Sequence, residues 1–208
     1  MAASWIRHHR KWQELFPAIS PVTLGSSALL FPPIIRDIIM WGGARHVDKK
    51  TFERSLAEGL SPILVPGGLA ELRLSKSTSK VIELNGRHRG FIRLALRHGT
   101  HIVPVYSFGE TLTMDTVHVP VLTGVAYRFL KMPFPYFTGL GGFLQVPRRN
   151  NITVVFGSPI SVEKDEDPSE EKITELHRRF YKETEKLFED HKHKYGHGEH
   201  TLKVLHLQ

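Results

Sequence analysis

Apolar residues along this chain follow two alternating patterns, short runs and longer amphipathic stretches. Short runs rich in β-branched residues predict strands at 21–24, 63–66, 102–108 and 152–156. Between them, apolar residues recur at helical spacing and predict helices at 33–41, 49–58 and 87–98. Because strands that alternate with helices favour a mostly parallel sheet covered by helices, we expect an α/β fold.

Capping residues mark the ends of these helices. Asp48 predicts the N-cap of the second helix. Gly42, Gly59 and Gly99 each follow a predicted helix end, where a left-handed backbone is commonly needed.

A long helix near the C-terminus has the clearest pattern. Asp167 and Pro168 predict its cap and first turn, and acidic residues follow at the positive end of its dipole. One face carries an apolar row, which we expect to dock on the sheet: Ile173, Leu176, Phe180, Leu187 and Phe188. Residues 196–208 have no such row and are expected to form a flexible tail.

Composition narrows the class of protein. The chain has 208 residues, of which 40% are hydrophobic and 24% charged, as in a globular domain. It has no cysteine, which excludes disulfides, thiolate metal sites and a cysteine nucleophile. The net charge of +7 favours an anionic partner, and nucleic acid, an acidic membrane surface and a phosphate-bearing substrate all qualify.

Membrane contact, if present, is expected at the interface. The most apolar stretch, 24–41, is interrupted by two prolines and two charged residues, so it falls short of the roughly 20 apolar residues that cross a bilayer. We also see no cleavable signal peptide. Residues 129–147, dense in Phe, Pro and Gly, predict an irregular apolar loop that is either a lid over the core or a surface dipping into lipid.

Two stretches could carry chemistry. The first contains Gly67, Gly68 and Glu71 directly after a predicted strand, where ligands bind in open α/β sheets and glycine lets a substrate approach the backbone. The alternative is an ordinary strand-to-helix turn with Glu71 in the first helical turn.

The second stretch, 87–110, begins with a predicted helix. Arg89, Arg93 and Arg97 recur every fourth residue, which places one basic stripe on that helix. Such a stripe can neutralise phosphates, although a solvated charged face is the commoner role of this pattern.

Together these stretches resemble the diacylglycerol acyltransferase type 2 family, which also includes monoacylglycerol and wax-alcohol acyltransferases. The family motif is matched almost completely between residues 87 and 110. The matching residues are Arg87, Gly90-Phe91, Arg93, Ala95, Gly99, Ile102-Val103-Pro104 and Phe108-Gly109-Glu110. Only Ile102, in place of the usual Leu or Val, departs from the pattern. Further matches are Phe16-Pro17, Trp41-Gly42-Gly43, Val47-Asp48, Gly67-Gly68, Glu71 and 155–159.

The resemblance implies a glycerolipid-acyltransferase-like domain at 16–195, after a basic segment at 1–15. It implies transfer of a fatty acyl group from acyl-CoA to diacylglycerol or a related lipid alcohol at the endoplasmic reticulum membrane, in triacylglycerol and neutral lipid synthesis. Acyl-CoA is then a substrate, and no metal or bound cofactor is implied. The implied substrate-binding residues are Gly67, Gly68, Glu71, Arg89, Arg93, Arg97, Val103, Pro104 and Tyr106.

The family's catalytic motif, His-Pro-His-Gly, does not occur in this sequence. We therefore expect the chain to begin downstream of it. A lipid hydroxyl needs a base before it attacks a thioester, and histidine suits that task at neutral pH. His9 and Glu14 have the spacing of the His-x4-acid motif of related acyltransferases, but a pair at this spacing is also a frequent accident, so the catalytic residue is unassigned.

Two other functions are compatible with the residues. A catalytically inactive relative would still bind acyl-CoA or membrane. A nucleic-acid-binding protein would explain the charge, but the sequence lacks zinc-finger, helix-turn-helix and aromatic-rich sheet patterns, so we expect no nucleic-acid partner.

Overall fold

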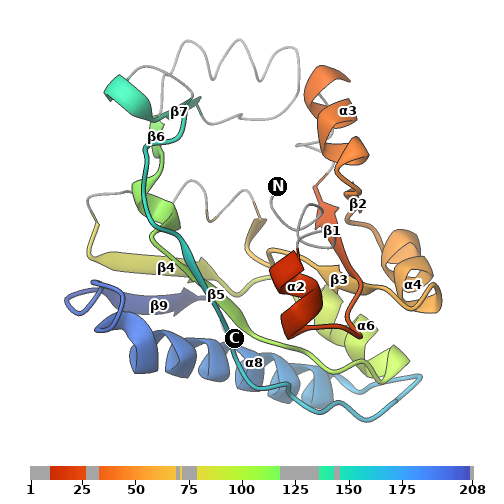
Figure 1. The fold of residues 1–208 in the computed structure, drawn as a ribbon. Coiled ribbons are helices and arrows are strands. Elements are labelled where there is room, and N and C mark those ends of the chain that lie inside the picture. The colour runs from red at the N-terminus through yellow and green to blue at the C-terminus, as the bar shows by residue number, and fades with distance from the viewer. Residues whose placement is uncertain are drawn as a thin grey trace. The chain divides into compact units, whose positions relative to one another are not determined.

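The computed structural model describes residues 10–26, 33–68, 71, 79–117, 136–142 and 146–206. The chain divides into two compact units, 1–65 and 66–208, each described here by itself. Figure 1 shows their helices and strands. In the first unit these are α2 (Arg10–Leu15), β1 (Pro21–Gly25), α3 (Pro33–Trp41), β2 (Arg45–His46), α4 (Lys49–Ala57) and β3 (Ser61–Ile63).

A small parallel sheet forms the centre of the first unit. β1 lies between β2 and β3 and pairs in parallel with both. Val22 and Leu24 of β1 are buried, as is Phe52 of α4. The N-cap predicted at Asp48 is confirmed, because its carboxylate accepts hydrogen bonds from the backbone N–H and the hydroxyl of Thr51.

The second unit holds the remaining elements. They are β4 (Val81–Asn85), α6 (Gly90–His98), β5 (Val105–Phe108), η1 (Glu110–Leu112), β6 (Asp115–Val117), β7 (Tyr136–Thr138), η2 (Leu140–Gly142), β8 (Thr153–Phe156), α8 (Glu170–Lys192) and β9 (Thr201–Leu205). β4 and β9 pair in parallel, whereas β5 with β8 and β6 with β7 pair antiparallel.

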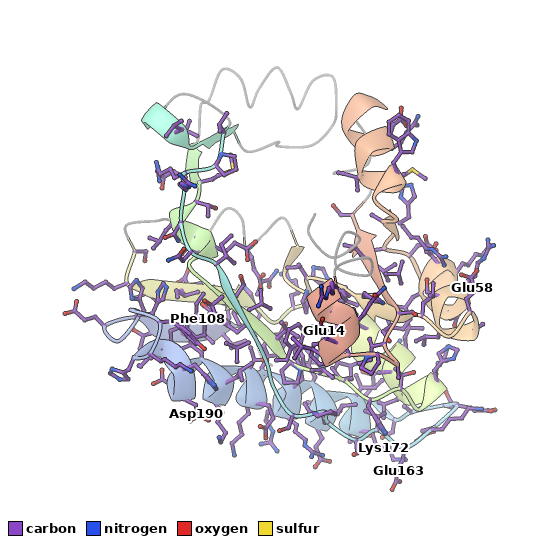
Figure 2. All side chains as sticks on the ribbon, viewed as in Figure 1. Glu14, Glu58, Phe108, Glu163, Lys172 and Asp190 are labelled. Atoms are coloured by element: carbon purple, nitrogen blue, oxygen red, sulfur yellow. The ribbon has the colours of Figure 1, made fainter. Side chains whose placement is uncertain are left out.

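Helix α8 organises the core of the second unit. All five apolar residues predicted to share a face of this helix are buried. Ile173, Leu176 and Phe180 pack with Ile92 and Leu96 of α6. Further along, Phe188 stacks on Phe108 of β5 with ring centroids 5.7 Å apart. Figure 1 shows α8 running beneath the β4–β9 pair, and Figure 2 labels Phe108.

The fold is α/β as predicted, but the single, mostly parallel sheet is not what the described residues form. They form short parallel and antiparallel sheets, and β5, expected in a parallel sheet, pairs antiparallel with β8. The predicted strand at 102–108 also begins later, at Val105. Ile102 makes only an isolated bridge to Ile160, and Pro104 lacks the N–H that would continue the ladder.

Three predicted boundaries shift. The strand predicted at 63–66 lies earlier, at Ser61–Ile63, and the helix predicted at 87–98 begins at Gly90. Helix α8 begins at Glu170, with Ser169 as its N-cap in place of the predicted Asp167. Gly59 and Gly99 have the left-handed backbone expected, whereas after α3 that conformation belongs to Gly43 and not to Gly42.

The predicted flexible tail contains a strand. Residues 201–205 form β9 in register with the whole of β4, from Val81 opposite Thr201 to Asn85 opposite Leu205. Leu84 and Val204 pack against the core of the unit. The tail is held because its backbone pairs with a strand more than a hundred residues earlier, which no local pattern reveals.

Two findings concern the membrane. Among the described residues, no helix combines the length and the apolarity that a bilayer crossing needs. Of the apolar loop predicted at 129–147, residues 129–135 and 143–145 lie outside the described residues. Within it, Tyr136–Thr138 form strand β7 and are not irregular as predicted.

Candidate functional site

Glu71 is helical and follows a turn at Pro66 and Gly67, as the alternative of an ordinary strand-to-helix turn predicts. We call Gly67, Gly68 and Glu71 the acidic turn. A Cβ atom on Gly67 would lie 1.8 Å from Cδ of Glu71 and 1.9 Å from its Oε1. The Glu71 side chain therefore folds back over the Gly67 backbone, into space that only glycine leaves open. Gly68 has φ of +56°, in the left-handed region that favours glycine. Both glycines thus shape the turn that carries Glu71.

Asn85, the last residue of β4, receives the Glu71 carboxylate. Its backbone N–H donates to Glu71 Oε1 at 3.0 Å, and its Nδ2 lies 3.5 Å from the Gly67 carbonyl oxygen. Its Oδ1 accepts from the Arg87 N–H at 3.3 Å, and its carbonyl oxygen accepts from the Tyr181 hydroxyl at 3.2 Å. Asn85 is 6% exposed and Tyr181 2% exposed, so these bonds are shielded from water.

Burial shifts the pKa values of Glu71 and of two tyrosines, Tyr181 and Tyr106. It raises the pKa of Glu71, and the hydrogen bond from the Asn85 N–H partly opposes that shift. Burial and the nearby Glu71 carboxylate raise the pKa of Tyr181. Tyr106 is affected in the same sense, by burial and then by the charges of Glu110 and Glu71. Both phenols therefore stay protonated beside the carboxylate at neutral pH.

The substrate-binding residues predicted at 103–106, Val103, Pro104 and Tyr106, do not share one environment. Pro104 is fully buried and Val103 is 40% exposed. Tyr106 packs its ring against Phe108 at 4.7 Å and Phe188 at 5.1 Å between centroids. Of these three residues, Tyr106 is the one whose pKa is raised by the charge of Glu71.

The arginine stripe faces helix α8. Arg89, at the N-cap of α6, donates to the Thr174 hydroxyl at 3.2 Å, and Arg93 forms an ion pair with Glu170. The Nε atom of Arg97 is buried and has no hydrogen-bond partner among the described residues. Docking of α6 on α8 accounts for the first two contacts without a ligand, so phosphate binding by the stripe stays a prediction.

The candidate catalytic pair His9 and Glu14 stays a prediction. His9 lies outside the described residues, and Glu14 forms an ion pair with Arg10 one turn earlier in α2, at 2.9 Å. Within the described part of the chain, no three potential metal ligands gather in one place.

Sequence reasoning missed three buried polar residues of the second unit: Asn85 and Tyr181, which lie near Glu71, and His177. Asn85 is the only polar uncharged residue of β4, and Tyr181 interrupts the apolar row of α8. His177, one turn before Tyr181, is 1% exposed, and its Nε2 has no hydrogen-bond partner among the described residues. Burial lowers its pKa, and the charge of Arg89 lowers it further. Polar residues at such positions were the available signal.

Known proteins match this chain along most of its length. The family model described as diacylglycerol acyltransferase matches residues 6–206. The chain belongs to the diacylglycerol acyltransferase family.

Curated members of this family share about a third of their residues with the chain. Human acyl-CoA wax alcohol acyltransferase 2 is 33% identical over 213 residues, which cover 94% of this chain and 63% of that protein. Bovine 2-acylglycerol O-acyltransferase 1 is 33% identical, with 91% and 60% covered. Human diacylglycerol O-acyltransferase 2 is 33% identical, with 87% and 50% covered. The chain thus spans between half and two thirds of these relatives' length. No solved structure matches it.

In this family member, the motif at 87–110 extends over three structural elements. It begins two residues after Asn85, runs through α6 and β5, and ends at Glu110 in η1. Two of its glycines, Gly99 and Gly109, have left-handed backbones, with φ of +63° and +83°. These positions explain why the motif requires glycine there.

Proposed function

We propose that this chain carries the substrate-binding part of an acyl-CoA-dependent O-acyltransferase, which transfers a fatty acyl group to diacylglycerol or a related lipid alcohol. Membership of the diacylglycerol acyltransferase family supports the reaction class. The relatives' names add wax alcohols, 2-acylglycerols and diacylglycerols as acceptor classes. The observation that carries the proposal is the Glu71 carboxylate, partly buried and held over Gly67 by Asn85.

The reaction needs no reagent beyond its two substrates. The alcohol oxygen forms a bond to the thioester carbonyl carbon, the carbon–sulfur bond breaks, and the hydroxyl proton ends on the released CoA thiol. Binding and orientation are the tasks we give to the described residues. We assign the base that first takes the proton to none of them.

Each substrate-binding residue has a proposed task. Glu71 accepts a hydrogen bond from the acceptor hydroxyl, in a turn that Gly67 and Gly68 keep narrow. Tyr106, with Val103 and Pro104 before it, forms the wall of the acyl pocket.

The arginines supply positive charge for the CoA phosphates. A guanidinium has five N–H donors in a planar fork, which suits it to charge-assisted hydrogen bonds with phosphate oxygens, and we give this task to Arg89, Arg93 and Arg97. Arg97 adds a third guanidinium to the same stripe.

The remaining parts of the proposal rest on the family alone. They are a glycerolipid-acyltransferase-like domain and a place at the endoplasmic reticulum membrane. Contact with the lipid interface through 129–147 rests instead on the apolar composition of that stretch.

The test separates binding from transfer. The full chain is expressed in microsomes that lack neutral-lipid acyltransferases and is given radiolabelled oleoyl-CoA with diacylglycerol, 2-acylglycerol or a long-chain alcohol. We expect a radiolabelled ester with at least one acceptor, and Glu71→Ala is expected to abolish it. Binding of oleoyl-CoA is measured separately on the same membranes.

Two results contradict the proposal in different ways. Oleoyl-CoA binding without ester would favour the inactive relative that only binds acyl-CoA. Absence of both would reject the substrate-binding role itself.

A further inference from the structure

We infer that Asn85 and Tyr181 are positioning residues, which hold the acidic turn against helix α8 so that the Glu71 carboxylate keeps a fixed direction. This inference rests on the proposed function, because it assigns these residues a task in acceptor binding. They do not contact substrate in the proposal, and they act through Glu71.

Asn85 uses all of its polar groups in hydrogen bonds. Both its backbone groups and both its side-chain polar atoms are engaged, with partners in three separate segments: the acidic turn, the start of the motif at Arg87, and α8. A side chain with this many buried partners fixes the segments relative to one another. A displacement of Asn85 would therefore also displace the Glu71 carboxylate, which the Asn85 N–H holds.

Asn85 is itself held in place by the β4–β9 pair and by helix α8. Asn85 ends β4, whose partner β9 follows α8 in the chain, and Gly86 N–H donates to the Leu205 carbonyl oxygen at 2.8 Å. The Tyr181 ring is buried in the core with Phe180 and Ile173. Its hydroxyl thus connects Asn85 to helix α8, whose apolar face is buried in the core, and Asn85 passes that constraint to Glu71.

Two variants distinguish a positioning role of these residues from a role in fold stability alone. Tyr181→Phe keeps the ring and removes only the hydroxyl, so the packing of the core is preserved. Asn85→Asp keeps the shape of the side chain but places a second carboxylate beside Glu71 and removes the donor to the Gly67 carbonyl. A negative neighbour disfavours the ionised form of Glu71. The two variants therefore perturb the same turn in different, recognisable ways.

The kinetic experiment uses the transfer assay with the full chain. We expect Tyr181→Phe to raise KM for the lipid alcohol about fivefold, the factor that loss of one typical hydrogen bond produces, with KM for oleoyl-CoA unchanged. We expect Asn85→Asp to move the acidic limb of the pH–rate profile to higher pH. Tyr195→Phe, which removes a hydroxyl elsewhere in the unit, is the matched control and is expected to change neither quantity. In a Glu71→Gln background the effect of Tyr181→Phe should disappear.

A second measurement does not depend on activity. The chain has no cysteine, so single cysteines can carry a nitroxide label. At Val65, which is 68% exposed and precedes the turn, we expect Tyr181→Phe to make the label more mobile. At Ile152, which is 52% exposed in the loop before β8, we expect no change.

The outcomes separate the two proposals. Increased mobility at Val65 in a chain that forms no ester would reject the proposed function and leave the anchoring role intact. Unchanged mobility at Val65 would overturn the positioning role, whatever the activity of the chain. In an active chain, equal effects of Tyr181→Phe on both KM values would overturn it as well.

Discussion

Replacing Gly67 with alanine tests the architecture of the acidic turn most directly. The new Cβ would lie 1.8 Å from Cδ of Glu71, whereas nonbonded carbon atoms sit at about 3.5 Å or more. The atoms in the way are Cγ, Cδ and Oε1 of the flexible Glu71 side chain, so the side chain is expected to move its carboxyl group by about 1.5 Å and the backbone to stay. That movement breaks the 3.0 Å hydrogen bond from the Asn85 N–H.

The magnitude follows from the group that is left behind. A backbone N–H that loses its acceptor in a shielded site costs about 1–3 kcal/mol. Alanine also restricts the unfolded chain, which offsets about 0.4–1 kcal/mol. We therefore expect a net loss of about 1–2 kcal/mol in the free energy of unfolding, or about 0.5–1 M in the urea midpoint for a slope of about 2 kcal/mol/M.

The assay is urea unfolding followed by circular dichroism, with Gly25→Ala as the control. A Cβ on Gly25 meets no atom of the described residues within 4 Å, so that variant is expected to be as stable as the native chain or slightly more so. If the two alanine variants unfold at the same urea concentration, Glu71 does not occupy the space over Gly67 and the site described here is wrong.

Three further predictions concern the second unit. Arg93→Glu should lower the free energy of unfolding by about 1 kcal/mol, and adding Glu170→Arg should restore it. In the double variant the affinity for oleoyl-CoA should stay reduced. Full recovery of that affinity would limit the role of Arg93 to helix docking. The pKa of His177 is lowered in the folded chain from its ordinary value of 6.5. As the pH drops through 6.5, the unfolded chain therefore binds a proton at His177 before the folded chain does, and the free energy of unfolding falls. His177→Leu should therefore flatten the pH dependence of the unfolding midpoint between about pH 7 and pH 5. Deletion of 201–208 should cost about 2 kcal/mol or more, because the β4 ladder and its apolar partners are lost, and an unchanged thermal midpoint would contradict the pairing of β9.

Local patterns in the sequence determined much of the fold. The helices α3, α4 and α8 and the strands β1 and β8 lie where apolar spacing predicts them, since periodicity reports the face that a single segment buries. The buried row on α8 and the cap at Asp48 were predictable for the same reason. The motif at 87–110, a continuous stretch of sequence, was enough to indicate the family that the comparison shows.

Only the tertiary structure decided which residues meet. Glu71 was predicted as a site residue, but its partner Asn85 lies fourteen positions away, and the Tyr181 hydroxyl that holds Asn85 comes from ninety-six positions further along the chain. The antiparallel partner of β5, the strand within the predicted tail and the contacts of the arginine stripe with α8 are also long-range. A sequence pattern records the environment that each segment prefers, whereas pairing depends on the free energy of the whole packed arrangement, and no single segment contains that information.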